Sequence, residues 1–177
     1  MSGPRLAFGP DRAVYAVWRS KYRTPKTRLT NFQVSSDGGA TWAPDSRTLN
    51  QGETTFSPQI AQGPDGLLVV TWSDERGGGR PKPFDVFVTR SRDGGKTWSD
   101  EVKVSPTEED GIGGPINVRP QVVVGPHGLV YLGWTSVLAR GGSTILFRRS
   151  LDAGVTDRKS TRLNSSHIQK SRMPSSA

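Results

Sequence analysis

Residues 91–98 read SRDGGKTW and residues 35–42 read SSDGGATW, two copies of the pattern S-x-D-x-G-x-T-W. The Asp-Gly-Gly run predicts a tight turn between two strands, because glycine adopts positive φ angles and a short Asp side chain bonds to its own turn. A third stretch at 150–157, SLDAGVTD, keeps Ser, Asp, Gly and Thr but has Asp157 in place of Trp. The pattern therefore predicts a hairpin that recurs three times along the chain.

A second motif recurs between these hairpins. Apolar segments that end in Trp each follow a Gly-Pro turn, and a short apolar segment precedes each turn. They are AVYAVW at 13–18, LLVVTW at 67–72 and LVYLGW at 129–134, and together with the hairpins they contain all five tryptophans. In the second unit we expect strands near 59–61, 67–72, 84–90 and 101–104. Four short antiparallel strands repeated at this period are typical of a propeller blade, so the sequence predicts an all-β partial β-propeller.

The composition agrees with this fold class. Of 177 residues 32% are hydrophobic, and 21 glycines and 13 prolines favour short strands with many turns. No apolar run is long enough to cross a bilayer and no signal peptide is visible, so we expect no membrane span. Cysteine is absent and histidine is scarce, so we expect neither a metal site nor a cofactor.

The net charge of +8 raises the alternative of a nucleic-acid-binding protein. Half of this excess lies in residues 157–177, and no aromatic residues are interleaved with a basic patch. We therefore expect no nucleic-acid partner.

The repeated box has a structural interpretation. Its Asp can accept hydrogen bonds from the N–H groups of the turn, its second Gly allows the turn, and its Trp can pack on a neighbouring strand or blade. A metal-binding or sugar-binding loop is the alternative, but recurrence in every unit favours a role in the architecture. The box residues are Ser35, Asp37, Gly39, Thr41, Trp42, Ser91, Asp93, Gly95, Thr97, Trp98, Ser150, Asp152, Gly154 and Thr156.

The box resembles the Asp-box, or BNR repeat, of sialidases and other β-propellers, and the sequence from WSDER to DGGKTW at 72–98 is similar to a blade of bacterial sialidase-like proteins. The resemblance covers residues 4–156 and implies a ring of six blades, of which residues 1–156 hold about three. It places blade 1 at about 4–50, blade 2 at about 57–105 and an incomplete blade 3 at about 119–156. It also implies a glycan or glycoconjugate ligand and a secreted or periplasmic location.

Residues 157–177 have a separate interpretation. The run DRKSTRLNSSH at 157–167 is similar to the translated ligation adapter of short-read DNA sequencing, and SRMPSSA at 171–177 matches its continuation. A natural Ser-, Lys- and Arg-rich tail is the rival interpretation. We expect a non-native, disordered tail, which explains why the third box loses its Trp, and we expect further blades to be missing.

The ligand face is expected opposite the boxes, where the loops after the Trp strands lie. These loops, at 19–28, 73–84 and 135–143, are rich in charged residues, which suits an anionic or polyhydroxylated ligand but is also ordinary for solvated loops.

Sialidases hold the substrate carboxylate with three arginines and use an Asp as acid/base and a Tyr–Glu pair as nucleophile. The segment SDER at 73–76 resembles the family's A-E-x-R, so the resemblance implies that Arg76 binds substrate. The family's first substrate-binding arginine normally lies in an R-I-P motif at the start of a blade's first strand. The sequence VRP at 118–120 is one residue short of this motif, so Arg119 is the candidate for that arginine. Asp74 and Asp85 are the candidates for a catalytic carboxylate, and no nucleophile pair is recognisable before Thr156.

The sequence therefore predicts a fragment of an exo-α-sialidase-like glycoside hydrolase that acts on terminal sialic acids or related glycosides, inactive by itself. A non-catalytic Asp-box propeller that binds glycans or proteins is the alternative. The lack of an acid within 77–84 and of an arginine before Pro58 favours this alternative.

Overall fold

The computed structural model describes residues 3–20, 27–52, 54–76, 83–106, 115–138 and 141–152, and the backbone of Thr161–Leu163. Within these residues the chain consists of β-strands and one 3-10 turn at Pro126–Gly128. None of their helical structure is long and apolar enough to span a membrane. Gly154, Thr156 and segments 157–160 and 164–177 lie outside the described residues.

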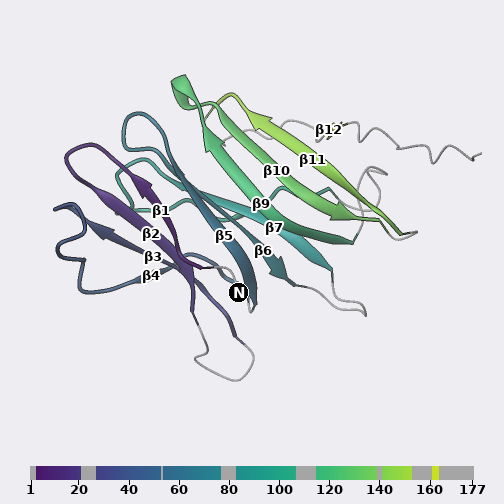
Figure 1. Ribbon diagram of the computed structural model, residues 1–177, viewed down its shortest axis with the longest axis horizontal. Helices are drawn as coiled ribbons and strands as arrows, with labels where there is room; N and C mark the ends of the chain where they lie inside the picture. Colours follow the sequence, from purple (N-terminus) through teal and green to yellow (C-terminus); the bar gives the residue numbers. More distant parts are fainter. Residues whose placement is uncertain are drawn as a thin grey trace, which may run out of the picture.

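The strands form three successive units, which we call blades 1 to 3 (Figure 1); blade 1 is a four-stranded sheet, and blades 2 and 3 are linked into an eight-stranded sheet by the pairing of β7 with β9. Blade 1 comprises β1 (Arg5–Phe8), β2 (Val14–Arg19), β3 (Thr30–Ser35) and β4 (Arg47–Thr48). Blade 2 comprises β5 (Thr55–Gln62), β6 (Leu68–Glu75), β7 (Phe84–Ser91) and β8 (Val102–Lys103). Blade 3 comprises β9 (Ile116–Val124), β10 (Val130–Val137), β11 (Ser143–Ser150) and β12 (Thr161–Leu163).

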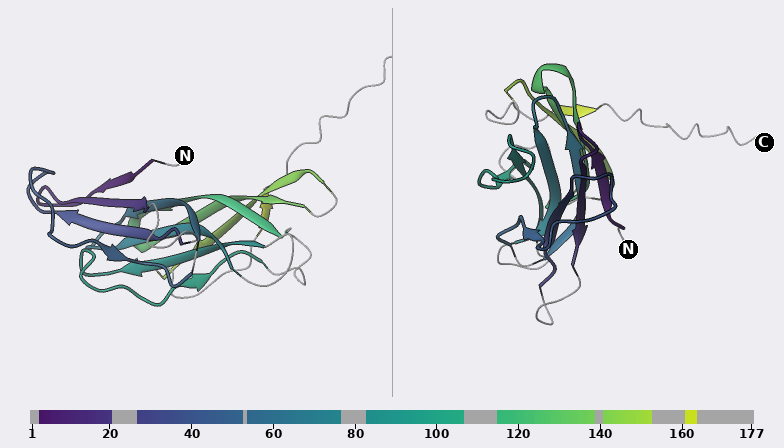
Figure 2. Two further views of the ribbon diagram at one scale, coloured as in Figure 1. Left: turned by 90° about the horizontal axis from the view of Figure 1, so that it is seen from below. Right: turned by 90° about the vertical axis from the view of Figure 1, so that its left-hand side faces the viewer.

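Neighbouring strands within each blade pair antiparallel, and the Gly-Pro turns close the first hairpin of every blade. The N–H groups of Gly9, Gly63 and Gly125 donate to carbonyls four residues later, at 2.9, 2.8 and 2.7 Å. The predicted all-β, partial-propeller fold is therefore confirmed. The axes of the strands are roughly aligned with one another, as Figure 2 shows.

Two hydrophobic layers hold the blades together. We call the face that carries the Trp of the second strand the front face of a blade, and the opposite face its back face. The front face of blade 2 (Leu68, Val70, Trp72, Phe87) packs on the back face of blade 1 (Ala7, Tyr15, Val17, Phe32). The front face of blade 3 (Val122, Val130, Leu132, Trp134, Leu146) packs on the back face of blade 2 (Leu67, Val69, Val86, Val88). Blade 2 is thus sandwiched between the others.

The box residues form the hydrogen bonds that their structural interpretation requires. In blade 2 the Asp93 carboxylate accepts bonds from the Thr97 N–H at 2.9 Å, the Thr97 hydroxyl at 2.5 Å and the Ser91 hydroxyl at 2.7 Å. Asp37 in blade 1 has the same three bonds, and in blade 3 the Ser150 hydroxyl donates to Asp152. Gly95 has a φ of 92° in the turn.

The same bonds predict a pH effect. The Thr97 hydroxyl, followed by the Thr97 N–H and the Ser91 hydroxyl, lowers the pKa of Asp93 below its ordinary 3.8. A lowered pKa means that ionised Asp93 stabilises the fold above pH 3.8 and that this contribution is lost as the pH falls below it. The stability difference between the native chain and Asp93→Asn should therefore shrink below pH 3.8. Urea denaturation followed by Trp fluorescence at several pH values measures it.

Asp45→Asn is the matched control, because Asp45 is an exposed carboxylate outside any box. If both variants showed the same pH dependence, the box hydrogen bonds would have no specific role in acid stability.

Part of the expected tail forms a strand. Thr161–Leu163 pairs antiparallel with Ile145–Phe147 of β11, at the place that the fourth strand takes in the other blades. This differs from the disorder expected for residues 157–177. The physical reason is that β11 otherwise presents a row of unpaired N–H and C=O groups, which pairs readily with any extended segment.

Candidate functional site

The edge opposite the boxes is where the second strand of each blade ends and the third begins. We call it the loop edge. The connecting segments 21–26, 77–82, 107–114 and 139–140 lie outside the described residues, so the site is built from the strand ends.

One backbone contact recurs at this edge between successive blades. Arg28 in blade 1 forms a parallel bridge with Thr54 in blade 2, and Phe84 in blade 2 forms a parallel bridge with Ile116 in blade 3. The Thr55 N–H donates to the Arg28 carbonyl at 2.8 Å, and the Phe84 N–H donates to the Pro115 carbonyl at 2.9 Å. These contacts fix the spacing of the blades at the loop edge.

Two arginines and two phenylalanines form a cluster at the first of these contacts. The guanidinium carbons of Arg19 and Arg28 lie 5.2 and 5.7 Å from the centroid of the Phe56 ring, and the Phe84 ring is 5.3 Å from that of Phe56. All four side chains are half-buried. We call this group the Arg–Phe cluster. Its two cations and apolar rings provide complementary contacts for a charged group and for an apolar surface.

A repeated β-bulge lies in the first strand of two blades. Ser57 and Arg119, each directly before a proline, have φ angles of 50° and 56°. The pairing shifts register at both places. Left-handed backbone is strained for residues with a Cβ, and such bulges re-aim side chains near functional sites. Arg119 is exposed.

Asp74 and Arg76 meet in a network of blade 2 residues. The Arg76 Nη2 donates to Asp74 Oδ2 at 2.7 Å and to Glu101 Oε2 at 2.8 Å, while Nη1 bonds to Glu101 Oε1. The guanidinium lies 3.9 Å from the centroid of Phe87. Burial raises the pKa of Asp74, and the hydrogen bond and charge of Arg76 oppose that rise.

The network leaves little room around it. A Cβ at Gly52 would stand 2.2 Å from Asp74 Oδ2 and 2.4 Å from Arg76 Nε, so only glycine fits there. The Asp74 side chain is fully buried and that of Arg76 is 26% exposed. The network therefore lies within blade 2, against Gly52 of the segment that connects blade 1 to blade 2, and Arg76 is its most accessible member.

Asp85 is also held by its neighbours. Its Oδ1 accepts a bond from the Ser105 hydroxyl at 2.7 Å and its Oδ2 pairs with Lys103 Nζ at 2.9 Å. The structure thus joins Asp74 to Arg76, ties Asp85 to different partners and places Arg119 in another blade. Sequence reasoning missed the Arg–Phe cluster. The available signal was that Arg19 directly follows the Trp of its strand and that Phe56 directly precedes the bulge.

The chain matches no protein-family model and no curated protein sequence. Solved structures are similar to it at low identity. A sialidase of Trypanosoma rangeli in complex with the inhibitor DANA aligns over 88% of this chain with a TM-score of 0.61 and 17% identity, and 29% of that protein is covered. An α-L-arabinanase of Penicillium chrysogenum complexed with arabinobiose aligns over 90% of this chain with a TM-score of 0.65 and 17% identity, and 48% of that protein is covered.

A protein of unknown function from Dyadobacter fermentans DSM 18053 aligns over 88% of this chain with a TM-score of 0.64 and 15% identity, and 52% of it is covered. The chain thus spans between 29% and 52% of the length of these three proteins. At these identities the similarity establishes the fold alone.

Proposed function

We propose that this chain is part of a glycan-acting β-propeller, an exo-α-sialidase-like glycoside hydrolase for terminal sialic acids or related glycosides, whose ligand face is the loop edge. The Arg–Phe cluster carries the proposal. It places two guanidinium groups within 5.2 and 5.7 Å of one phenyl centroid. Guanidinium groups bind carboxylates through paired hydrogen bonds, and the phenyl rings offer an apolar surface to a sugar ring.

Arg119 and Arg76 are proposed as further contacts to the ligand. Arg119 is exposed on its bulge, and Arg76 keeps part of its side chain accessible. The solved structures similar to this chain support the proposal, because their names include a sialidase with an inhibitor and an arabinanase with arabinobiose. A glycan-acting role also implies the secreted or periplasmic location expected from the resemblance.

A non-catalytic, glycan-binding propeller is the second candidate function. The observation that favours it is that both candidate carboxylates are engaged, Asp74 with Arg76 and Asp85 with Lys103 and Ser105. An acid/base needs hydrogen-bond reach to the substrate, and these contacts hold Oδ2 of Asp74 and both carboxylate oxygens of Asp85 on neighbouring side chains. We propose that the chain alone binds its ligand without turnover.

Binding by the full chain tests the proposal. Saturation-transfer NMR with N-acetylneuraminic acid should show binding, and Arg28→Ala should weaken it roughly tenfold or more, because a charge-assisted hydrogen bond is lost. Arg92→Ala is the matched control, since Arg92 is exposed in the box turn at the opposite edge.

Arabinobiose serves as the neutral probe in the same experiment. Binding of arabinobiose without binding of the acidic sugar would refute the sialic acid assignment, and equal loss in both arginine variants would refute the site. Hydrolysis of a fluorogenic sialoside by the chain would contradict its inactivity.

A further inference from the structure

Two sheet faces have no partner within the described residues. The front face of blade 2 covers the back face of blade 1, and the front face of blade 3 covers the back face of blade 2. The front face of blade 1 and the back face of blade 3 remain open. They lie at opposite ends of the row of blades in Figure 1.

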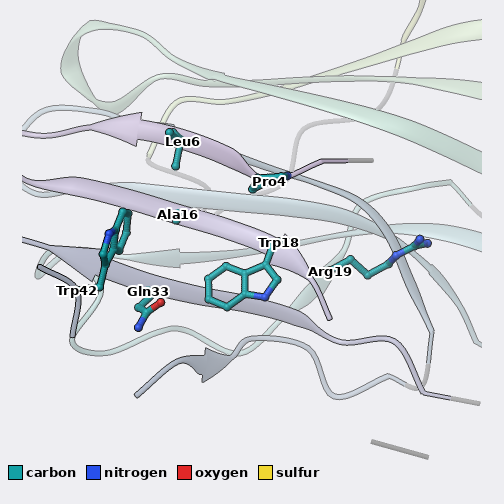
Figure 3. A pocket seen from close by; sticks show the side chains of 7 residues that line it. All are labelled: Pro4, Leu6, Ala16, Trp18, Arg19, Gln33 and Trp42. Atoms are coloured by element: carbon teal, nitrogen blue, oxygen red, sulfur yellow. The ribbon is translucent and has the colours of Figure 1, made fainter. Parts of the chain in front are cut away.

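The open front face of blade 1 is apolar. Leu6 is 52% exposed, Phe8 70% and Trp42 38%. Together with Trp18, the residues Leu6 and Trp42 line a hollow of about 550 Å³, and Figure 3 shows both indole rings at this hollow.

These residues repeat those of a face that is already covered. Trp18 has the repeat position of Trp72, which is fully buried against blade 1. Trp42 has the repeat position of Trp98, which packs edge-on against Phe32 of blade 1 with ring centroids 5.0 Å apart. The front face of blade 1 thus carries the same pair of tryptophans that attaches blade 2 to its neighbour.

The open back face of blade 3 repeats the other half of that interface. Tyr131 stacks on Phe147 at 6.0 Å, as Tyr15 stacks on Phe32 at 6.2 Å in blade 1. Val123 and Ile145 on this face are 61% and 43% exposed. The front face of blade 1 therefore resembles the front face of blade 2, and the back face of blade 3 resembles the back face of blade 1. Because the front face of blade 2 packs on the back face of blade 1, the two open faces are complementary in the same way.

We propose that two copies of this chain associate head to tail, the front face of blade 1 in each copy on the back face of blade 3 in the other. In this assembly Trp42 of one copy packs edge-on against Phe147 of the other, as Trp98 does against Phe32. Closed propellers contain about four to eight blades, so the three blades that the structure describes make a ring of six in two copies, whereas three copies exceed this range. Head-to-tail contacts that close form rings. The proposal does not depend on the proposed glycan site.

Sedimentation velocity of residues 1–177 over a concentration series tests the proposal. A dimer is expected, and Leu6→Asp on the front face or Val123→Asp on the back face should each abolish it. Both side chains are more than half exposed, 52% and 61%, so the blades should still fold, which circular dichroism verifies. Leu151→Asp is the control, because Leu151 is equally apolar, 44% exposed and located in the third box turn.

Mixing the two variants distinguishes head-to-tail association from other pairings. The mixture keeps one intact interface, formed by the front face of the Val123→Asp chain and the back face of the Leu6→Asp chain, so a heterodimer is expected.

Gly39→Ala is a further test of the contact. A Cβ added at Gly39 would have no atom of its own chain within 4 Å, whereas a Cβ added at the equivalent Gly95 would lie 2.4 Å from Phe32. In the ring, alanine at 39 would meet Phe147 and prevent the dimer.

Three results would overturn the proposal. A monomer at every concentration would mean that the open faces belong to other blades. A dimer that survives Val123→Asp but not Leu6→Asp would mean front-to-front pairing. Failure of the mixed variants to associate would exclude the head-to-tail contact.

Discussion

Replacing Arg76 with methionine should lower the free energy of unfolding by about 3–5 kcal/mol at neutral pH, the usual cost of removing one partner from a buried charge pair. The Asp74 side chain is fully buried and that of Glu101 is 8% exposed. Without Arg76, two carboxylates are left next to each other in an apolar layer. Methionine keeps an apolar side chain next to Phe87, so the lost free energy of unfolding can be attributed to the missing charge of Arg76. Urea denaturation followed by Trp fluorescence measures it.

The pH dependence of this loss identifies its origin. Burial already raises the pKa of Asp74, and Arg76 opposes the rise, so the variant should raise that pKa further. A carboxyl group with a raised pKa stabilises the fold at low pH and loses that contribution as the pH rises through the folded-state pKa. The cost of Arg76→Met should therefore be smaller at pH 5 than at pH 7.

Adding Asp74→Asn in the Arg76→Met background should recover part of the lost stability, because the uncompensated charge is removed. A loss below about 0.5 kcal/mol at pH 7, as for a surface ion pair, would show that the network does not stabilise the fold as a buried charge pair.

Gly95→Ala should cost about 2–5 kcal/mol, far more than the same change at Gly39. Both glycines have the same place in their boxes, with φ angles of 92° and 93°. Left-handed backbone strain of about 1–2 kcal/mol is therefore common to both variants. Only at Gly95 would the new Cβ also meet the Phe32 ring, at 2.4 Å, and overpacking adds about 1–3 kcal/mol. Phe32 cannot withdraw easily, since Trp98 packs against its edge.

Thermal and urea denaturation at dilutions where both variants are monomeric measure the difference. Phe32→Leu should relieve the clash and make Gly95→Ala less costly in the double variant. Equal costs at the two glycines would contradict the close approach of the blade 2 turn to blade 1.

The fold was predictable from the repeat because the strands of each blade pair with strands that are adjacent to them in the sequence. The turn glycines, the Gly-Pro hairpins and the apolar strands all act within one unit, so their spacing alone indicated four strands per blade. The strand expected near 59–61 is longer in the structure, Thr55–Gln62, because a bulge between Phe56 and Gln59 accommodates Pro58 within it.

The candidate site was less predictable because it depends on contacts between blades. Arg19 and Arg28 come from blade 1 and Phe56 from blade 2, so no local pattern links them. The resemblance drew attention to Arg76, but its binding to Glu101, 25 residues later, could not be inferred from the SDER motif. Packing between blades decides whether a charged side chain faces a ligand or a neighbouring blade, and no local sequence motif predicts that packing.

The order of covering between blades has a consequence for synthesis on the ribosome. The back faces of blades 1 and 2 are each closed by the front face of the blade that follows in the chain, so the back face of blade 1 stays open until the segment through Trp98 has emerged. Chains fold from the N-terminus while they are being made. The growing end therefore always presents one uncovered apolar sheet, and a stalled or shortened chain would expose that sheet to chaperones and to other nascent chains.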